Sequence, residues 1–500
     1  MTLFDGTLFD GSVEWGTLAL LFVCLAIALS FEFVNGFHDT ANAVATVIYT
    51  RSLKPWVAVI WSGSMNFLGV LMGGAAVAFS IVHLLPVDLL INIGKKAGLL
   101  MVLSLLVTAI AWNFGTWYFG LPASSSHALI GSILGVGLAS SLFSGQGFGS
   151  GVNWTKAQQV GLSLLISPLV GFLLAGGLLL LSKELLKKRG LFEEPQGDQP
   201  PPLWIRAILF LTCTGVSFAH GSNDGQKGVG LIMLILIGIL PTHYAINTNF
   251  DAAEAGKALA GIQQVQTILA RSAQSAQSAQ SGGYEARGVA EDLTKISAVL
   301  SDAAGLKSLS PQSRIDLRNR ILRADDRLGE FEKAQAAFLP PADRDTLDQL
   351  RSRMRGVVDF VVIWVLVAVA FALGIGTTVG WKRVVVTIGE KIGKTHLSYA
   401  QGASAELVAM TTIAAGDMFG LPVSTTHVLS SGVAGTMAAN LSGLQMRTIR
   451  NIALAWALTL PVTMLLAGAL FAGTAQGALR EIGATPVAPQ RPELVLPKLE

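Results

Sequence analysis

Long runs of apolar residues, separated by short polar loops, cover most of this chain. A transmembrane helix needs roughly 20 mostly apolar residues, and many of the runs reach or approach that length. Two shorter runs, 121–142 and 421–439, each begin in a Gly-Leu-Pro sequence, where proline ends the preceding helix. The pattern predicts an all-α polytopic membrane protein with broken helices and re-entrant hairpins. The predicted full-length segments are 16–34, 56–84, 97–119, 158–182, 204–219, 228–247, 357–379, 398–415 and 449–473.

The composition strengthens this interpretation. Apolar residues make up 51% of the 500 residues and charged residues only 13%, against about 25% charge in soluble domains. The lipid bilayer is therefore the expected environment. The formal net charge of +3 is small and scattered, which argues against a nucleic-acid partner. Cys24 and Cys213 lie inside apolar runs and are expected to be packing residues.

Two motifs occur twice, in the same order, in the two halves of the chain. Gly36-x-x-Asp39 recurs as Gly221-x-x-Asp224, and GLPASSSH from residue 120 recurs as GLPVSTTH from residue 420. The sequence thus predicts two homologous repeats of about five to six membrane segments each. The expected parts are a first repeat (15–182), a linker (183–203), the start of the second repeat (204–248), a soluble helical insert (249–356), the remainder of the second repeat (357–475) and a tail (476–500).

Basic residues in short loops indicate how the repeats are oriented. Arg51 and Lys54 place one loop on the cytoplasmic side, and the basic residues of 183–189 place the linker there too. The first repeat then crosses the membrane an odd number of times, so the second begins on the opposite side. The predicted repeats are therefore inverted. This arrangement places Lys95 and Lys96 on the periplasmic side, where basic residues are disfavoured, so they argue against it.

Residues 249–356 interrupt the second repeat with a segment rich in Ala, Gln and charge. The low-complexity stretch SAQSAQSAQS and the Arg- and Asp-rich section 310–337 predict a solvated helical hairpin tethered between membrane segments. A regulatory or assembly role is the alternative. The topology places the insert on the periplasmic side, although long loops follow the charge rule poorly.

Two acidic residues occupy matching positions inside apolar segments. A charged side chain within a membrane costs about 2.5–3.5 kcal/mol, so Asp39 and Asp224 are expected to mark a transport pathway. Matching positions of inverted repeats meet near the bilayer midplane. Gly36 and Gly221 would let each helix unwind there and expose backbone groups to a ligand. In the alternative interpretation, the carboxylates only cap helices at a membrane surface.

Hydroxyl side chains follow each Gly-Leu-Pro sequence, at the predicted start of a new helix. A helix N-terminus carries partial positive charge and unpaired N–H groups, which attract anions. Each run taken alone is equally an ordinary helix cap, but the two together predict an oxyanion site. Ionised Asp39 and Asp224 would repel that anion, so a proton or cation is expected to neutralise them first. The hydroxyl residues are Ser124, Ser125, Ser126, Ser424, Thr425 and Thr426.

Lys227 and Glu406 are further ionisable residues in apolar segments. Lys227 stands where the first repeat has Asn42, and would contact the anion or pair with Asp224; a lipid-facing or loop position is the alternative. Glu406 has no counterpart in the first repeat. It would handle a cation or proton, or satisfy an interhelical hydrogen bond.

No nucleophile–base or metal-ligand set emerges from the sequence, so we do not expect an enzyme.

Four segments resemble the signature sequences of the inorganic phosphate transporter (Pit) family. They are GFHDTANAVATVIYTR, GLPASSSH, HGSNDGQKG and GLPVSTTHVLSS, and they follow one another in the family's order. The resemblance is to the bacterial low-affinity Pit-type carriers in particular. It covers about 15–248 and 357–475, and leaves out the insert and the tail.

The resemblance implies secondary active transport of inorganic phosphate across the cell inner (cytoplasmic) membrane. Bacterial carriers of this type are proton-coupled and accept phosphate as a neutral complex with a divalent metal such as Mg²⁺; other members are sodium-coupled. Gln226 and Lys227 depart from the family's commoner Asn-Asp-x-Ala-Asn-Ala form, which favours protons. The coupling residues implied are Asp39, Asp224 and Glu406. The candidate substrate-binding residues are Asn42, Ser124, Ser125, Ser126, Asn223, Lys227, Ser424, Thr425 and Thr426.

The leading prediction is proton-coupled phosphate import by alternating access, with no cofactor apart from the co-transported proton and a metal that enters with phosphate. A sodium-coupled phosphate or sulfate symporter on the same scaffold is one alternative, and a passive anion channel is another. Dimers are common among such carriers, so a homodimer is a further expectation.

Overall fold

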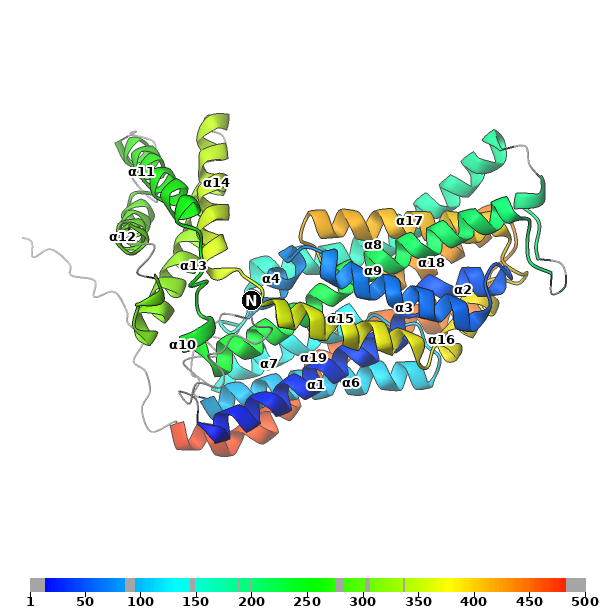
Figure 1. Ribbon diagram of the computed structural model, residues 1–500, viewed down its shortest axis with the longest axis horizontal. Helices are drawn as coiled ribbons and strands as arrows, with labels where there is room; N and C mark the ends of the chain where they lie inside the picture. Colours follow the sequence, from blue (N-terminus) through cyan, green and yellow to red (C-terminus); the bar gives the residue numbers. More distant parts are fainter. Residues whose placement is uncertain are drawn as a thin grey trace, which may run out of the picture.

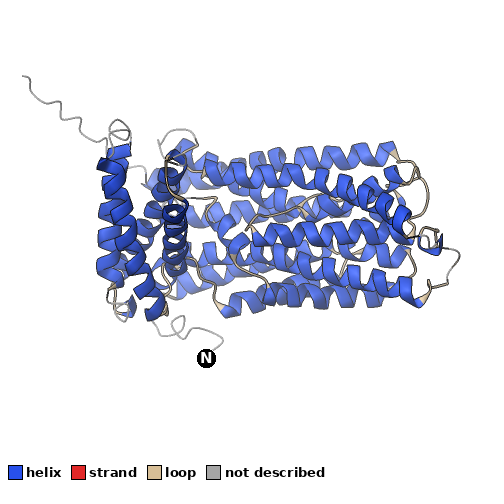
Figure 2. Cartoon of the chain, turned by 90° about the horizontal axis from the view of Figure 1, so that it is seen from above, coloured by secondary structure: helices blue, strands red, loops and turns tan. Residues whose placement is uncertain are grey.

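Helices form a long bundle, and a second group of helices covers one end of it, in the computed structural model of the protein (Figure 1). The structure describes residues 14–85, 95–143, 149–186, 189–195, 197, 199–274, 282–301, 306–335 and 338–482. Helices dominate these residues, as predicted, and Figure 2 shows the second group standing across the end of the bundle.

The bundle has the length and the surface of a membrane domain. Among the described residues, 7 helices are long and apolar enough to cross a membrane, or up to 8 with a pair bent by 83°. Large apolar side chains such as Leu165 and Leu465 are 70% exposed on its outside, where lipid would cover them. The bundle consists of α1 (Trp15–Asp39), α2 (Ala41–Tyr49), α3 (Pro55–Met72), α4 (Ala76–Val82), α6 (Lys95–Tyr118), α7 (Ser125–Phe143), α8 (Trp154–Leu185), α9 (Leu203–Ile239), α15 (Ile363–Thr378), α16 (Lys382–Glu390), α17 (Tyr399–Met418), α18 (Thr425–Ala439) and α19 (Met446–Ile482).

Of the two predicted helix breaks, the first is a single-residue interruption within one candidate span, Trp15–Tyr49, where Thr40 keeps helical backbone angles, and the second does not exist. α1 ends at Asp39 and α2 begins at Ala41, so the chain interrupts the helix only at Thr40. α9, in contrast, continues from Leu203 to Ile239 through Asp224, so the separate segments 204–219 and 228–247 are one helix. The glycine of the second motif allows a close helix contact and does not unwind the helix.

Glycines bring helices together in the same way in both halves of the bundle. A Cβ added at Gly69 of α3 would lie 2.2 Å from the carbonyl oxygen of Phe218 in α9. A Cβ added at Gly376 of α15 would lie 2.2 Å from the carbonyl oxygen of Phe33 in α1. Phe33 and Phe218 hold equivalent places before the two Gly-x-x-Asp motifs. Each motif is thus packed at backbone distance against a neighbouring helix.

The two Gly-Leu-Pro segments also have matching local structures. Gly120 and Gly420 have φ values of +66° and +63°, in the left-handed region that glycine adopts without strain. The side-chain oxygens of Ser124 and Ser424 then accept the N–H three residues on, at 3.2 Å in both cases. Each segment therefore reverses the chain and caps the helix that follows, α7 or α18.

Replacement of Gly221 by alanine is expected to destabilise the bundle. The new Cβ would lie 2.2 Å from the carbonyl oxygen of Asn66, so α3 and α9 must move apart, at a cost of about 1–3 kcal/mol. Gly161→Ala in α8 is the matched control, because nothing lies within 4 Å of its added Cβ and alanine favours helix by about 1 kcal/mol. Thermal unfolding in detergent should show a lower midpoint for Gly221→Ala and an unchanged or higher one for Gly161→Ala. Equal midpoints would contradict the proposed close contact.

The insert is more than a helical hairpin. Its helices α11 (Ala252–Gln274), α12 (Gly282–Leu300), α13 (Pro311–Ala334) and α14 (Pro341–Val358) share a hydrophobic core that includes Leu293, Ile321 and Leu347. The short α10 (Pro241–Tyr244) joins α9 to this group. The expectation of a hairpin was wrong, because the insert has four amphipathic helices and each buries its apolar face against the others. Most of SAQSAQSAQS, and all of 483–500 within the predicted tail, lie outside the described residues.

The chain enters and leaves the insert at one place. The guanidinium Nη1 of Arg318, which is fully buried, donates to the carbonyl oxygens of Ala245 and Val358 at 3.0 and 2.9 Å. The N–H of Asn247 donates to the carbonyl oxygen of Val357 at 2.7 Å. The two ends of the insert therefore lie side by side at the end of the bundle opposite η2 (Arg189–Leu191), which lies between α8 and α9 (Figure 1).

Candidate transport site

Asp39 and Asp224 meet in the middle of the bundle. Asp39 ends α1 and Asp224 lies in α9, and both are at most 1% exposed. The hydroxyl of Ser125, in the first turn of α7, donates to Oδ2 of Asp39 at 2.9 Å and lies 3.5 Å from Oδ2 of Asp224. The structure therefore brings together the two carboxylates and the first hydroxyl run, as the sequence predicts. Both carboxylates are buried among helices of the bundle and do not reach its outer surface.

The second hydroxyl run binds the other oxygen of the same carboxylate. Thr426, in the first turn of α18, donates to Oδ1 of Asp39 at 2.8 Å and accepts from the side-chain amide of Asn42 at 2.9 Å. Nδ1 of His38 lies 3.0 Å from the same Oδ1. Two helix N-termini, one from each half of the chain, thus meet at one carboxylate.

Lys227 lies inside the site and does not face lipid. Its side chain is 1% exposed, and its ammonium donates to Oδ1 of Asp224 at 2.6 Å and to the hydroxyl of Ser126 at 2.5 Å. The three-residue spacing on α9 places the ammonium and the carboxylate on one helix face. Lys227 therefore links Asp224 to the first hydroxyl run with a positive charge.

The hydroxyl residues divide into caps and inward-facing groups. Ser124 and Ser424 are the caps described above, whereas Ser125, Ser126 and Thr426 contact the charged residues. Thr425 is buried in the first turn of α18. The first N–H groups of a helix have no partner within that helix, so the starts of α7 and α18 offer donors to an anion between them.

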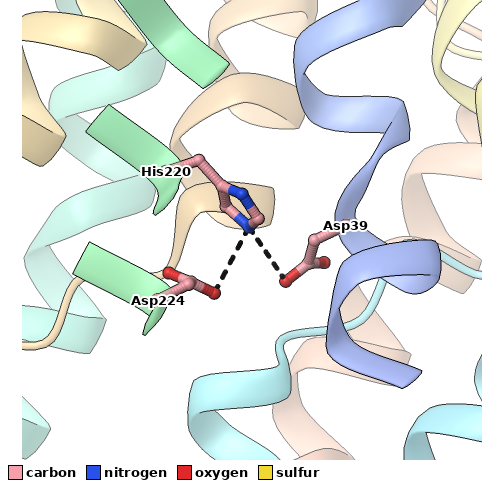
Figure 3. A group of neighbouring side chains, drawn as sticks. All are labelled: Asp39, His220 and Asp224. Atoms are coloured by element: carbon pink, nitrogen blue, oxygen red, sulfur yellow. Dashed lines mark ion pairs between the residues drawn. The ribbon is translucent and has the colours of Figure 1, made fainter. Parts of the chain in front are cut away.

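His220 completes the group, although sequence reasoning did not single it out. Its Nε2 lies 3.5 Å from Oδ2 of Asp224 and 3.8 Å from Oδ2 of Asp39 (Figure 3). Its Nδ1 lies 3.0 Å from Oδ1 of Asn66 in α3. The four-residue spacing between His220 and Asp224 in one helix was the available signal, but the expected helix break at Gly221 hid it.

The hydrogen bonds of the Asn223 side chain run to Asp417 and to the second Gly-Leu-Pro segment. Its amide donates to Oδ1 of Asp417 at 2.7 Å, and its Oδ1 accepts from the N–H of Val423 at 3.3 Å. Asn223 thus fastens the second Gly-Leu-Pro segment to α9. Asp417 lies in the last turn of α17, just before that segment. It is a second residue that sequence reasoning missed. A direct contact between Asn223 and a substrate stays a prediction.

Glu406 is buried at a distance from the carboxylate pair. Its two carboxyl oxygens accept hydrogen bonds from Thr46 of α2 and Thr212 of α9. Thr46 follows Asp39 by seven residues, about 10 Å along a helix. Glu32, also fully buried, precedes Asp39 by the same spacing. Buried carboxyl groups, of Glu32 in α1 and of Glu406 of α17 beside α2, therefore lie on both sides of Asp39 along the chain, and a coupling role for Glu406 stays a prediction.

Residues 35–467 match the family described as "Phosphate transporter family". The chain belongs to this phosphate transporter family. The family resemblance inferred from the signature segments is thereby confirmed, and membership makes the chain a transporter and not an enzyme.

Several relatives within the phosphate transporter family match over nearly their whole length. "Low-affinity inorganic phosphate transporter PitA" of Escherichia coli (strain K12) is 42% identical over 492 residues, covering 93% of this chain and 98% of the relative. "Low-affinity inorganic phosphate transporter PitB" of the same strain is 41% identical over 480 residues, covering 90% and 96%. A "Probable low-affinity inorganic phosphate transporter" of Bacillus subtilis (strain 168) is 27% identical, covering 89% and 94%.

One solved structure shares the fold. "The sodium-dependent phosphate transporter" aligns with a TM-score of 0.51 and 20% identity, over 93% of this chain and 100% of that one. This similarity supports the multi-span helical architecture of the family member described here. At this identity it concerns the fold alone.

Proposed function

We propose that this protein imports inorganic phosphate across the cytoplasmic membrane by secondary active transport. The observation that carries the proposal is the meeting of two hydroxyl-bearing helix N-termini, those of α7 and α18, at the buried carboxylate of Asp39. Helix starts bind tetrahedral oxyanions, and the relatives PitA and PitB are named as inorganic phosphate transporters.

Two inverted repeats would give such a site access to both sides in turn. The matching glycine contacts of Gly69 and Gly376, and the matching turns at Gly120 and Gly420, support two units with the same local structure. Their helix starts each donate a hydroxyl hydrogen bond to a different oxygen of Asp39. Rocking of one unit against the other would then open the site first outward and then inward.

The carboxylates provide the coupling. An ionised pair beside a phosphate raises its free energy by like-charge repulsion, so phosphate binds well only after a cation neutralises the pair. We propose that a proton is the coupling ion and that phosphate enters as a neutral complex with a divalent metal. Lys227, in place of an amide that could join an oxygen cage for sodium, supports protons over sodium.

Uptake of radioactive phosphate into proteoliposomes tests this proposal. An imposed inward proton gradient should drive concentrative uptake, whereas replacement of sodium by choline should leave it unchanged. Uptake indifferent to the proton gradient would reject proton coupling. Loss of uptake in choline would favour the sodium symporter. Competition by unlabelled sulfate would favour a sulfate carrier, and flux that runs only down the phosphate gradient would favour a channel.

Thr426→Val is expected to reduce phosphate uptake about 10-fold at subsaturating phosphate, because it removes a hydroxyl bonded to a charged group. Valine keeps the shape of threonine but leaves Asp39 and Asn42 without this partner. Thr411→Val is the matched control, because Thr411 is exposed on α17 and its hydroxyl bonds to its own helix. Initial rates across a range of phosphate concentrations provide the measurement. Equal effects of the two substitutions would argue against a role for Thr426 in binding.

A further inference from the structure

We propose that Asp39, His220 and Asp224 together bind the divalent metal ion that travels with phosphate. Each residue offers one ligand atom, and these atoms lie within 4.8 Å of one another. All three side chains are buried, and they come from two helices, α1 and α9, that face each other (Figure 3). This inference rests on the proposed function, since it names the ligands of the metal in the metal–phosphate complex.

The orientation of His220 is fixed by a chain of hydrogen bonds that ends on its far nitrogen. Thr377 donates to the carbonyl oxygen of Leu373 at 2.9 Å, and the amide nitrogen of Asn66 donates to Thr377 Oγ1 at 2.9 Å. The amide oxygen of Asn66 therefore faces Nδ1 of His220, at 3.0 Å, and accepts its proton. A metal-binding histidine typically donates its second N–H in this way, which fixes the tautomer and the ring.

The other nitrogen of His220 points into the space between the carboxylates. Nε2 is buried and makes no hydrogen bond to any described residue, although Oδ2 of Asp224 and Oδ2 of Asp39 lie 3.5 and 3.8 Å away. Metal–ligand bonds of about 2.1 Å put neighbouring ligand atoms roughly 3.0–3.5 Å apart. The distances from the histidine thus nearly suit a shared metal, and binding would draw the three ligand atoms, now within 4.8 Å of one another, closer together.

Charge explains why such a metal would recruit phosphate. Two carboxylates and the ammonium of Lys227 sum to one negative charge when the imidazole is neutral, and this repels an anion. A divalent cation held by the two ionised carboxylates changes the sum to one positive charge, so the metal neutralises the pair and the coupling proton binds outside the three ligands. Three protein ligands also leave coordination positions open, and Ser125 lies beside both carboxylates where a phosphate oxygen could approach.

The ligand set predicts a preference among metals. Imidazole suits transition metals, whereas Mg²⁺ prefers oxygen ligands and retains its waters. We therefore expect Mn²⁺ or Zn²⁺ to bind this group of residues more tightly than Mg²⁺.

Mn²⁺ bound to the purified full-length protein in detergent can be examined by pulsed electron paramagnetic resonance. The wild-type protein should bind one Mn²⁺ whose signal carries the ¹⁴N coupling of a ligated imidazole. His220→Gln should lose that coupling and weaken Mn²⁺ binding at least about 10-fold. His396→Gln, at an exposed histidine, is the matched control and should behave as wild type. Absence of ¹⁴N coupling in the wild-type protein overturns the proposal whether or not the variants fold, and so does coupling that persists in His220→Gln.

Phosphate uptake by the same preparations separates this inference from the proposed function. If the wild-type protein transports phosphate but its bound Mn²⁺ shows no ¹⁴N coupling, the metal site is wrong and the proposed function stands. If ¹⁴N-coupled Mn²⁺ binds and phosphate is not transported, the proposed function is wrong and the metal site stands.

Discussion

Asp39→Asn is expected to abolish concentrative phosphate uptake while the protein stays folded in the membrane. The carboxylate accepts hydrogen bonds from Ser125 on one oxygen and Thr426 on the other. An amide replaces one acceptor with a donor and removes the charge that a coupling ion must neutralise. Bonds to a charged group contribute about 1.5–3 kcal/mol each, so uptake should fall about 100-fold or more.

Radioactive phosphate uptake, normalised to the amount of folded protein in proteoliposomes, provides the measurement. Asp224→Asn should behave in the same way, because Asp224 shares Ser125 and His220 with Asp39. Asp316→Asn is the control, since Asp316 is an exposed residue of the insert. Wild-type rates in both Asp39→Asn and Asp224→Asn would show that neither carboxylate couples transport.

Lys227→Gln should destabilise the protein as well as stop uptake. The substitution leaves Asp224 buried without its 2.6 Å ion-pair partner, a change that costs about 3–5 kcal/mol in the free energy of unfolding. Thermal unfolding in detergent should show a clear fall in midpoint. Lys257→Gln is a closely matched control, because Lys257 pairs with Glu254 at the same three-residue spacing and 2.7 Å, but at the surface, where such pairs contribute about 0–1 kcal/mol.

A double variant separates the two effects of Lys227. Asp224→Asn combined with Lys227→Gln removes both charges, so most of the lost stability should return while uptake stays absent. If the double variant is as unstable as the sum of the single ones, the ion pair does not explain the stability of this region.

The sequence predicted the parts of the site that depend on period and repetition. A long apolar run in lipid must satisfy its backbone hydrogen bonds within itself, which a helix does, so the runs predicted a helical bundle. Because Asp39 and Asp224 recur within matching motifs, their meeting was predictable, and so was the approach of Ser125 and Thr426. Each of these inferences needed only the order of residues along the chain.

Other features depended on contacts that the order of residues does not contain. Gly221 was expected to unwind a helix, yet it permits close packing on Asn66, and only the neighbouring helix decides between these outcomes. The role of Asn66 in orienting His220 is invisible in sequence because 154 positions separate them. The core of the insert likewise arises from the way its helices pack together.

The shared attachment point held by Arg318 has an evolutionary consequence. A module whose two ends emerge side by side can be gained, exchanged or lost without altering the spacing of the helices that carry it. Ala245 and Val358, held by one guanidinium, are such ends. Selection can therefore remodel this appendage independently of the transport machinery, and a short flexible bridge in its place should leave the remaining architecture intact.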